Sequence, residues 1–253
     1  MRTHTTLVIN PKGGSGKTTV ATNLAASLAA TGAATALMDY DPQGSSLNWL
    51  RQRPANLPRI FGANGAPAKP GRLRSVEMRV PEETRELVID APAGASGLLL
   101  QEMLLRTHCI LIPVAPSAID IHATANFIRD LLLAGRIRAA NIRLGVIANR
   151  VRKTSPVYAP LERFLASLNF PLLSRLSDSE AFITAAETGV GVCDMDLVTA
   201  AAERQQFSPI VQWVQTRVAS TEAKTAAIAS FNPTASIPGR APLRIIGKVL
   251  PAA

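Results

Sequence analysis

The sequence 10-NPKGGSGKTT-19 lies between an apolar run at residues 6–9 and an Ala/Leu-rich segment at residues 20–30. A β-branched strand, a glycine-rich turn and an amphipathic helix in this order are typical of a phosphate-binding loop. In such a loop, backbone N–H groups converge on phosphate oxygens at the positive end of the helix. The stretch therefore predicts a nucleotide site at the start of the helix 17–30.

The expected nucleotide-binding residues form one continuous run: Gly13, Gly14, Ser15, Gly16, Lys17, Thr18 and Thr19. Glycines allow the backbone to approach the phosphates, where a Cβ atom would block the approach. Lys17 is expected to reach the β and γ phosphates, and the Thr18 hydroxyl is expected to hold Mg²⁺. A nucleoside triphosphate and Mg²⁺ are therefore the expected ligands.

The loop departs from the common phosphate-loop pattern at its first position. Pro11 stands where the pattern has a glycine, and a second lysine, Lys12, follows it. With Lys12, the stretch KGGSGKTT resembles the deviant Walker A loop of the ParA/MinD ATPases. That resemblance implies an ATP-sandwich homodimer in which Lys12 of one subunit touches the nucleotide bound by the other. Alternatively, Lys12 is a solvated charge beside a turn.

A pair of carboxylates follows the strand predicted at residues 34–38, in the stretch 39-DYDPQGSS-46. Acidic side chains at the carboxyl end of a parallel strand lie where open α/β sheets bind ligands. The stretch resembles switch I of the ParA family, which implies that Asp41 positions the attacking water and Asp39 orders the Mg²⁺ shell. The same residues are also ordinary chemistry for a capped turn before a helix at 47–52.

A third apolar strand, 87–90, ends in Asp90 and resembles a Walker B motif. By that resemblance Asp90 holds a Mg²⁺-bound water, and residues 93–97 form switch II. Asn149 follows a later strand at 144–148, where asparagine commonly contacts adenine in this family. A simple turn asparagine is the alternative for Asn149.

The remaining periodicity predicts strands at 110–114 and 172–173 and helices at 121–133, 160–168, 179–188 and 197–218. Ser117 and Asp120 form a possible capping box before the helix at 121. The expected fold is a single α/β domain over 1–218, with a mostly parallel P-loop NTPase sheet covered by helices on both faces. Residues 54–81 are expected to form a surface excursion with at most one short strand. The Ala/Pro-rich basic tail at 219–253 is expected to be mostly disordered.

The net charge of +9 is clustered: residues 51–86 carry eight basic and four acidic side chains. A basic patch is the electrostatic signature of a polyanion partner, usually DNA, although it can also serve solubility. The candidate DNA-binding residues are all basic and flank the predicted site: Arg51, Arg53, Arg72, Arg74, Arg150, Arg152 and Lys153.

Several functional classes are disfavoured by residues that the sequence lacks. Cys109 and Cys193 are far apart and outside any CxxC pair, which favours reduced, packed thiols over an iron–sulfur site. The only tyrosines are Tyr40 and Tyr158, unlike the tyrosine-rich tails of related bacterial tyrosine kinases. No apolar run approaches a membrane span of about 20 residues, and neither a signal peptide nor a helix-turn-helix extension is expected. A cytoplasmic, nucleoid-associated protein is expected.

The resemblance covers roughly residues 5–218 and implies a slow ATPase whose dimer binds nonspecific DNA. A cargo-adaptor protein would stimulate hydrolysis and release. Such short ATPases position plasmid or chromosome loci, chemotaxis clusters or carboxysomes. The serine variants of the loop and switch I resemble the orphan, cargo-positioning members more than the chromosomal ones. A MinD-like membrane positioner is the alternative, because apolar residues at 243–250 alternate with Arg244 and Lys248. Gly247, Pro242 and Pro251 disfavour a stable helix there, so membrane binding is not expected.

Overall fold

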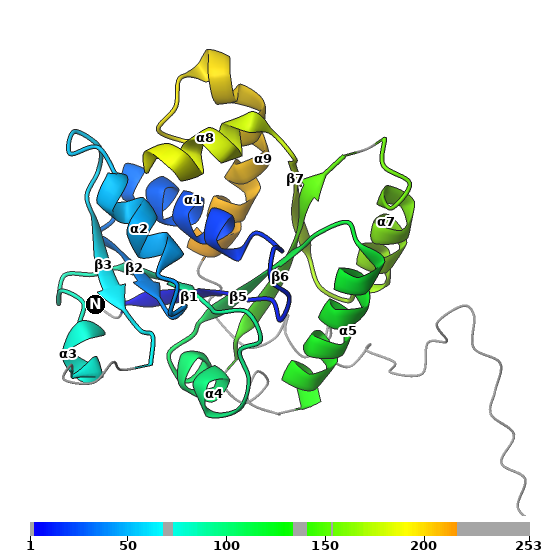
Figure 1. Cartoon of the computed structure of the whole chain (residues 1–253), viewed down its shortest axis with the longest axis horizontal. Helices are drawn as coiled ribbons and strands as arrows, with labels where there is room; N and C mark the ends of the chain where they lie inside the picture. The colour runs from blue at the N-terminus through cyan, green and yellow to red at the C-terminus, as the bar shows by residue number, and fades with distance from the viewer. Residues whose placement is uncertain (1–2, 68–72, 134–140, 153, 217–253) are drawn as a thin grey trace, which may run out of the picture. The chain divides into compact units, whose positions relative to one another are not determined.

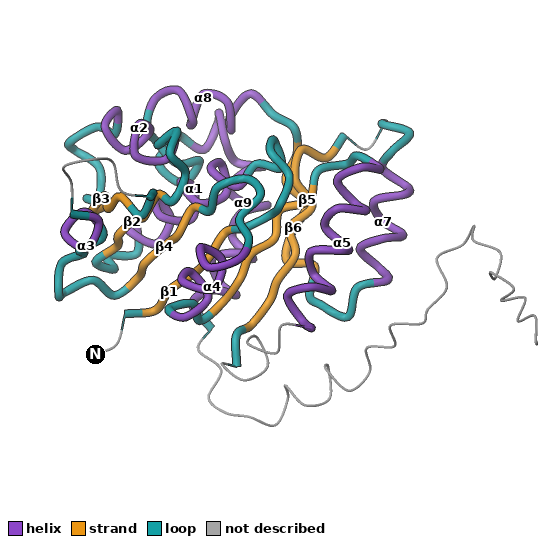
Figure 2. Tube along the Cα trace, turned by 60° about the horizontal axis from the view of Figure 1, so that its bottom comes forward, coloured by secondary structure: helices purple, strands orange, loops and turns teal. Residues whose placement is uncertain are grey.

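A seven-stranded, fully parallel β-sheet forms the centre of the computed structural model, which describes residues 3–67, 73–133, 141–152 and 154–216. Its strands, in spatial order, are β3 (Ile60–Asn64), β2 (Thr35–Asp39), β4 (Glu86–Asp90), β1 (His4–Val8), β5 (Cys109–Val114), β6 (Arg143–Val151) and β7 (Leu172–Ser177). Figure 2 shows the strands side by side with helices on either side. The phosphate loop leaves β1, near the middle of the sheet.

Helices cover both faces of the sheet (Figure 1). One face carries α1 (Lys17–Ala30), α2 (Ser45–Gln52), α8 (Glu180–Thr188) and α9 (Leu197–Gln215). The other carries α4 (Gly97–Leu105), α5 (Ala118–Leu133) and α7 (Tyr158–Ser167), and the short α3 (Arg74–Glu77) lies beside β3. This arrangement confirms the predicted P-loop NTPase-like α/β fold.

The central strands are buried along their whole length, which explains the consecutive apolar residues in them, such as Leu87–Ile89 and Cys109–Val114. Every residue of β1, β2, β4 and β5 is buried. A parallel strand covered on both faces cannot alternate between apolar and polar residues as a half-exposed strand does. In register, Asp39 pairs with Asp90, and Asp90 pairs with Val8. The two acids therefore end neighbouring strands, next to the strand that leads into the phosphate loop.

The boundaries of most predicted elements agree with the observed ones to within a few residues, whereas α3 and α4 were not predicted. The helix expected at 121 begins at Ala118, and the Ser117 hydroxyl accepts a 3.5 Å hydrogen bond from the Asp120 N–H. The strand expected at 172–173 continues to Ser177. The excursion at 54–81 contains β3, which pairs with β2 and forms the edge of the sheet. The tail at 219–253 lies outside the described residues.

Both cysteines are free, as predicted from their spacing. Burial raises the pKa of the Cys109 thiol to about 11, despite an opposing contact with the Thr6 hydroxyl. Burial also raises the pKa of Cys193. A thiol with a raised pKa stays protonated and unreactive at neutral pH, so both cysteines act as packing residues. Within the described ranges, no helix combines the length and the apolar character needed to cross a bilayer.

Candidate nucleotide site

The phosphate loop turns between β1 and α1 through two left-handed residues, Gly14 (φ 78°) and Gly16 (φ 87°). Gly16 is required for a second reason: an added Cβ atom would lie 1.9 Å from the Nδ2 atom of Asn149. Gly13 and Gly14 have open space where a Cβ atom would point. The loop therefore keeps a bare backbone on one side and packs tightly against Asn149 on the other, which suits a surface that binds phosphate oxygens.

Asn10 anchors the start of this loop, a role that the sequence did not reveal. Its buried side-chain amide donates to the Pro113 carbonyl (2.8 Å) and to the Thr124 hydroxyl (3.0 Å). Its carbonyl oxygen accepts from the Lys12 N–H at 2.9 Å. Asn10 thus ties the loop to β5 and α5, more than a hundred residues away. Nothing in the local sequence distinguishes such an anchor from an ordinary turn asparagine.

Lys17 and Thr18 begin α1 and face the acidic ends of the strands. The Lys17 ammonium donates to the Lys12 carbonyl at 3.0 Å, and the Thr18 hydroxyl donates to Asp90 Oδ2 at 2.8 Å. Burial lowers the pKa of Lys17, while Asp90 and Asp41 oppose that shift. Burial raises the pKa of Asp90 to about 7, and the neighbouring Asp39 adds to the rise. The structure thus brings Lys17, Thr18 and Asp90 together, as their sequence order suggested.

The Thr18 and Asp90 side chains fit a Mg²⁺ ion. Asp90 Oδ1 is buried without a hydrogen-bond partner in the described part of the chain. A buried carboxylate oxygen normally has a partner, and Mg²⁺ or its bound water supplies one with the right chemistry. Thr18 offers a hydroxyl oxygen beside it. These are the donors that a Mg²⁺ ion takes when nucleotide phosphates complete its shell.

Asp39 is fully buried, and its carboxylate accepts hydrogen bonds from the backbone of switch I. Its carboxylate accepts from the N–H groups of Asp41 (2.9 Å), Ser46 (3.0 Å) and Leu47 (3.2 Å). Burial raises the pKa of Asp39 even though these hydrogen bonds oppose the shift. A carboxylate at the first N–H groups of a helix stabilises that terminus. In this structure Asp39 therefore holds the switch I turn and the start of α2.

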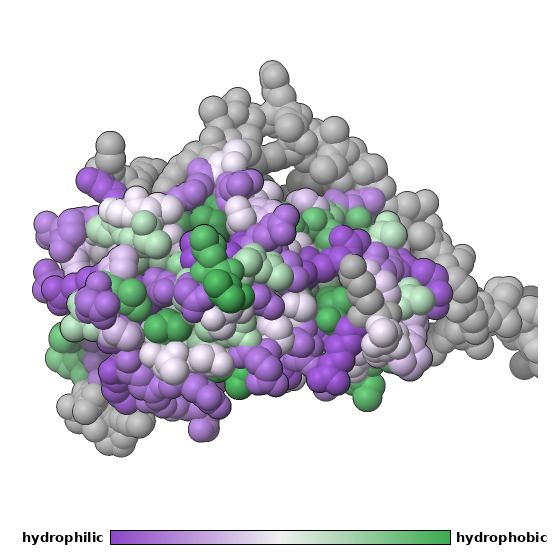
Figure 3. All heavy atoms as spheres, turned by 90° about the horizontal axis from the view of Figure 1, so that it is seen from above, coloured by the Kyte–Doolittle hydropathy of each residue, from purple (hydrophilic) through white to green (hydrophobic). Residues whose placement is uncertain are grey.

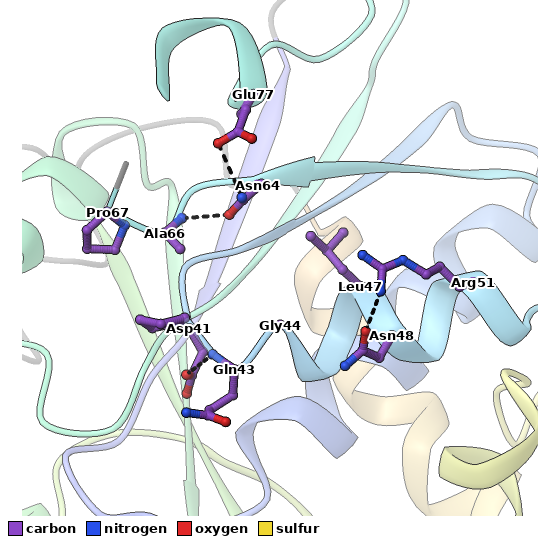
Figure 4. Close-up of a pocket in the computed structure, with 11 residues that line it drawn as sticks. Asp41, Gln43, Gly44, Leu47, Asn48, Arg51, Asn64, Ala66, Pro67 and Glu77 are labelled. Atoms are coloured by element: carbon purple, nitrogen blue, oxygen red, sulfur yellow. Dashed lines mark hydrogen bonds between the residues drawn. The ribbon is translucent and has the colours of Figure 1, made fainter. Parts of the chain in front are cut away.

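Asp41 starts the exposed part of switch I. Its carboxylate accepts from the Gln43 N–H at 2.9 Å, and its carbonyl accepts from the Gly44 N–H, also at 2.9 Å (Figure 4). Gly44 is left-handed, with φ 66°. The capped turn that the sequence allowed is therefore present. The charge of Asp41 opposes the lowered pKa of Lys17, as the charge of Asp90 does.

Switch II connects directly to the phosphate loop. The Gly94 N–H donates to the Pro11 carbonyl at 2.9 Å, and Gly94 is left-handed with φ 69°. Ser96 then precedes α4, which carries the chain away from the site. One backbone hydrogen bond therefore links the loop after β4 to the first residues of the phosphate loop.

Asn149 supports the phosphate loop from behind. Its buried amide donates to the Ser15 carbonyl at 2.9 Å. It also lines a separate hollow of about 290 Å³, shared with Thr19 and with the residues around Ser179 and Phe182. The Ser179 hydroxyl is buried without a hydrogen-bond partner in the described ranges. A polar atom of this kind at a hollow beside a phosphate loop suits a nucleoside, and base contact by Asn149 stays a prediction.

The predicted basic surface is only partly formed by the residues proposed for it. The Arg53 side chain is 4% exposed and forms an ion pair with Asp194 at 2.8 Å, so its expected place on a DNA-binding surface is wrong. Arg74 is also engaged, with Glu102 at 2.7 Å. Both arginines therefore form ion pairs with acidic side chains of the same chain.

Of the other basic candidates, three are described and two are not. Arg51 is exposed and bonds to Asn48, Arg152 pairs with Asp178, and Arg150 is exposed with φ 54°. Arg72 and Lys153 lie outside the described residues. In Figure 3 hydrophilic residues cover most of the face seen from above, interrupted by a few hydrophobic ones. Arg51, Arg150 and Arg152 are thus the described candidates that are exposed.

Comparison with known proteins agrees with this geometry. Residues 6–192 match the family model "CobQ/CobB/MinD/ParA nucleotide binding domain". The chain belongs to this family. The match includes the phosphate loop, both switches and Asn149, so the motif resemblance to ParA and MinD proteins is confirmed.

Individual members of the family are similar over most of the chain. "Maintenance of carboxysome distribution protein A" of Halothiobacillus neapolitanus is 26% identical over 174 residues, which are 67% of this chain and 77% of that protein. The structure of apo McdA from Cyanothece has a TM-score of 0.61 at 18% identity and covers 84% of this chain and 99% of its own. Septum site-determining MinD of Pyrococcus horikoshii, complexed with Mg-ADP, has a TM-score of 0.63 at 17% identity, covering 85% and 97%. The structural similarities show a shared fold.

Proposed function

We propose that this CobQ/CobB/MinD/ParA-family chain is a slow ATPase that positions a cargo. Two copies close around ATP and Mg²⁺, the closed homodimer binds nonspecific DNA, and an adaptor protein on the cargo stimulates hydrolysis. The observation that carries the proposal is the convergence of Lys17, Thr18 and Asp90 on a loop that also holds a second lysine, Lys12. The relative named for carboxysome distribution supports a protein complex such as a carboxysome as the cargo.

The proposed roles follow from where the side chains lie. Lys17 holds phosphate charge, and its depressed pKa comes from burial that phosphate binding would offset. Thr18 and Asp90 hold Mg²⁺, which when bound neutralises charge that develops on the phosphates. Asp41 releases the Gln43 N–H and orients the attacking water. The backbone N–H and carbonyl of Lys12 form hydrogen bonds with Asn10 and Lys17 of its own loop. The Lys12 ammonium is the group that contacts the nucleotide of the second subunit.

The hollow beside Thr19 and Asn149 is the proposed nucleoside site. Asn149 and Ser179 supply polar atoms there, and Phe182 supplies an apolar wall. An apolar pocket with a few placed polar groups is the usual form of a nucleoside site. Fluorescent ATP should bind the wild-type chain and compete with ADP. Replacement of Ser179 by a bulky residue should weaken that binding.

Dimerisation separates this proposal from a monomeric nucleotide-binding domain. With ATP and Mg²⁺ the chain should sediment as a dimer, and with ADP as a monomer. A chain that binds ATP yet remains monomeric at high concentration would contradict the sandwich. In that case Lys12 would be a solvated charge at the edge of the turn.

DNA binding is tested by its dependence on salt. Each phosphate that the dimer neutralises should contribute about −0.9 to the slope of log K against log salt. Nonspecific duplex DNA and vesicles that contain anionic lipid should be compared, each with ATP. Binding to vesicles alone would favour the MinD-like alternative, whose proposed anchor at 243–250 lies outside the described residues.

A further inference from the structure

Tyr40 lies between the two acids of switch I and is fully buried. Its hydroxyl donates to Glu102 Oε1 at 3.0 Å, and Glu102 belongs to α4, the helix after switch II. Gly65 packs on the Tyr40 ring so closely that an added Cβ atom would lie 2.6 Å from the ring carbons. Tyr40 is therefore fixed at both the hydroxyl and the ring.

Arg74 completes this contact from a third segment. Its guanidinium donates to both Glu102 oxygens, at 2.7 and 3.0 Å, and also to the carbonyls of Gly65 and Ala66. Its Cζ atom lies 5.6 Å from the Tyr40 ring centroid, within cation–π distance. A bidentate arginine–carboxylate pair fixes the orientation of both side chains. Arg74, Glu102 and Tyr40 thus form one connected group, the Arg74–Glu102–Tyr40 bridge.

The protonation states of Tyr40 and Glu102 are those that the hydrogen bond between them requires. Burial raises the pKa of Tyr40 to about 12, so its hydroxyl keeps the proton that it donates. Although burial opposes the shift, the hydrogen bonds from Arg74 and Tyr40 lower the pKa of Glu102. Glu102 therefore remains a carboxylate that accepts from both partners near neutral pH.

The other side of switch I borders a hollow of about 390 Å³ (Figure 4). Asp41, Gln43 and Gly44 form one wall, and Asn64 and Pro67 form part of the opposite one. In the described part of the chain, the turn from Asp41 to Gly44 therefore borders this hollow on that side. The turn is held by the hydrogen bonds from the Gln43 and Gly44 N–H groups to Asp41, by the Asp39 carboxylate and by the anchored Tyr40 that precedes it.

We propose that Arg74 and Glu102 are positioning residues that couple switch I to α4 through Tyr40 and so set the place of the Asp41 carboxylate. The inference rests on the proposed function, in which Asp41 orients water. Switch II leads directly into α4, so a shift of that helix moves Glu102 and, with it, the residue before Asp41. Gly94 of switch II also donates to the Pro11 carbonyl of the phosphate loop, so the segment that leads into α4 contacts the loop through Gly94 and switch I through Glu102.

Two variants test the bridge in the nucleotide-free chain. Tyr40→Phe removes the hydroxyl and keeps the ring, and Glu102→Ala removes the shared acceptor. Hydrogen–deuterium exchange should become about fivefold faster in residues 39–47 and 97–105 together, since one hydrogen bond is worth about 1 kcal/mol. Arg79→Gln, an exposed arginine of the same segment, is the matched control and should leave both regions unchanged. Faster exchange in only one of the two regions would overturn the coupling.

Turnover shows whether the coupling positions Asp41. At saturating ATP and Mg²⁺, kcat of Tyr40→Phe and Glu102→Ala should fall about tenfold, with the ATP dissociation constant changed by less than about threefold. The double variant should lose no more than Glu102→Ala alone, since both act through one contact. An unchanged kcat in the single variants would reduce the bridge to a packing contact. A wild-type chain without turnover would contradict the proposed function, while the exchange experiment would still decide the coupling.

Discussion

The phosphate loop and the arginine-rich segment at 51–86 both stand out in the sequence. The structure brings the loop residues together as predicted, whereas it pairs two of the arginines with acids of the same chain. In the loop, the residues named from their order meet: Lys17 and Thr18 lie against the strand that ends in Asp90. In the arginine-rich segment, Arg53 forms an ion pair with Asp194, and Arg74 forms one with Glu102. A motif specifies geometry through spacing, whereas charge composition says nothing about which charges are already paired.

The largest expected effect separates the two lysines of the loop. Lys12→Ala should leave ATP binding to the monomer unchanged and lower turnover by about 10³-fold, as groups supplied in trans to phosphoryl transfer do. Lys17→Ala should abolish ATP binding itself, measured with fluorescent nucleotide. Equal turnover in Lys12→Ala and wild type, with the same ATP-dependent dimer, would remove the special role of Lys12.

The arginine-rich segment is tested with a pair of matched variants. Arg53→Ala leaves Asp194 buried without its ion-pair partner, which should cost about 3 kcal/mol and lower Tm by roughly 10 °C. Arg51→Ala, at an exposed arginine two residues earlier, should change stability by less than about 0.5 kcal/mol. Only Arg51→Ala is expected to weaken DNA binding while leaving Tm unchanged. Thermal unfolding and DNA affinity, measured on both variants, decide between the two roles.

Asp41 tests whether the exposed part of switch I belongs functionally to the loop. Asp41→Ala should retain ATP binding and trap the dimer, with turnover reduced by about 100-fold because the water loses its orientation. Single-turnover hydrolysis and sedimentation measure the two effects separately. Normal hydrolysis by this variant would leave Asp41 with its turn-capping role alone.

Stability without nucleotide is also expected to depend on pH through Asp90. The pKa of Asp90 is about 7 in the folded chain, well above that of an unfolded aspartate, so the folded state binds the extra proton between about pH 4 and pH 7. Its contribution to stability is present at low pH and is lost as the pH rises through 7. Asp90→Asn should therefore flatten this decline and raise Tm at pH 8, while weakening Mg²⁺-dependent ATP binding. A steeper decline in the variant would contradict the assignment.

Much of the site was predictable because local sequence dictates local geometry. Glycines at positive φ, a helix start and carboxylates at strand ends are each specified within a few residues, and parallel strands bring their carboxyl ends to one edge. Asp39 was found but its contacts were not: its oxygens are used by three backbone N–H groups of switch I. Asn10 was missed, because its partners on β5 and α5 are more than a hundred residues away.

By itself, the sequence determined the family fold and the phosphate loop with its second lysine. Those features depend on residue type and spacing, which short segments carry. Only the tertiary structure decided which arginines are free, what Asn149 supports and how Tyr40 is tied to α4 through Glu102. These contacts join segments that are distant along the chain, so their partners exist only once the sheet has brought them together.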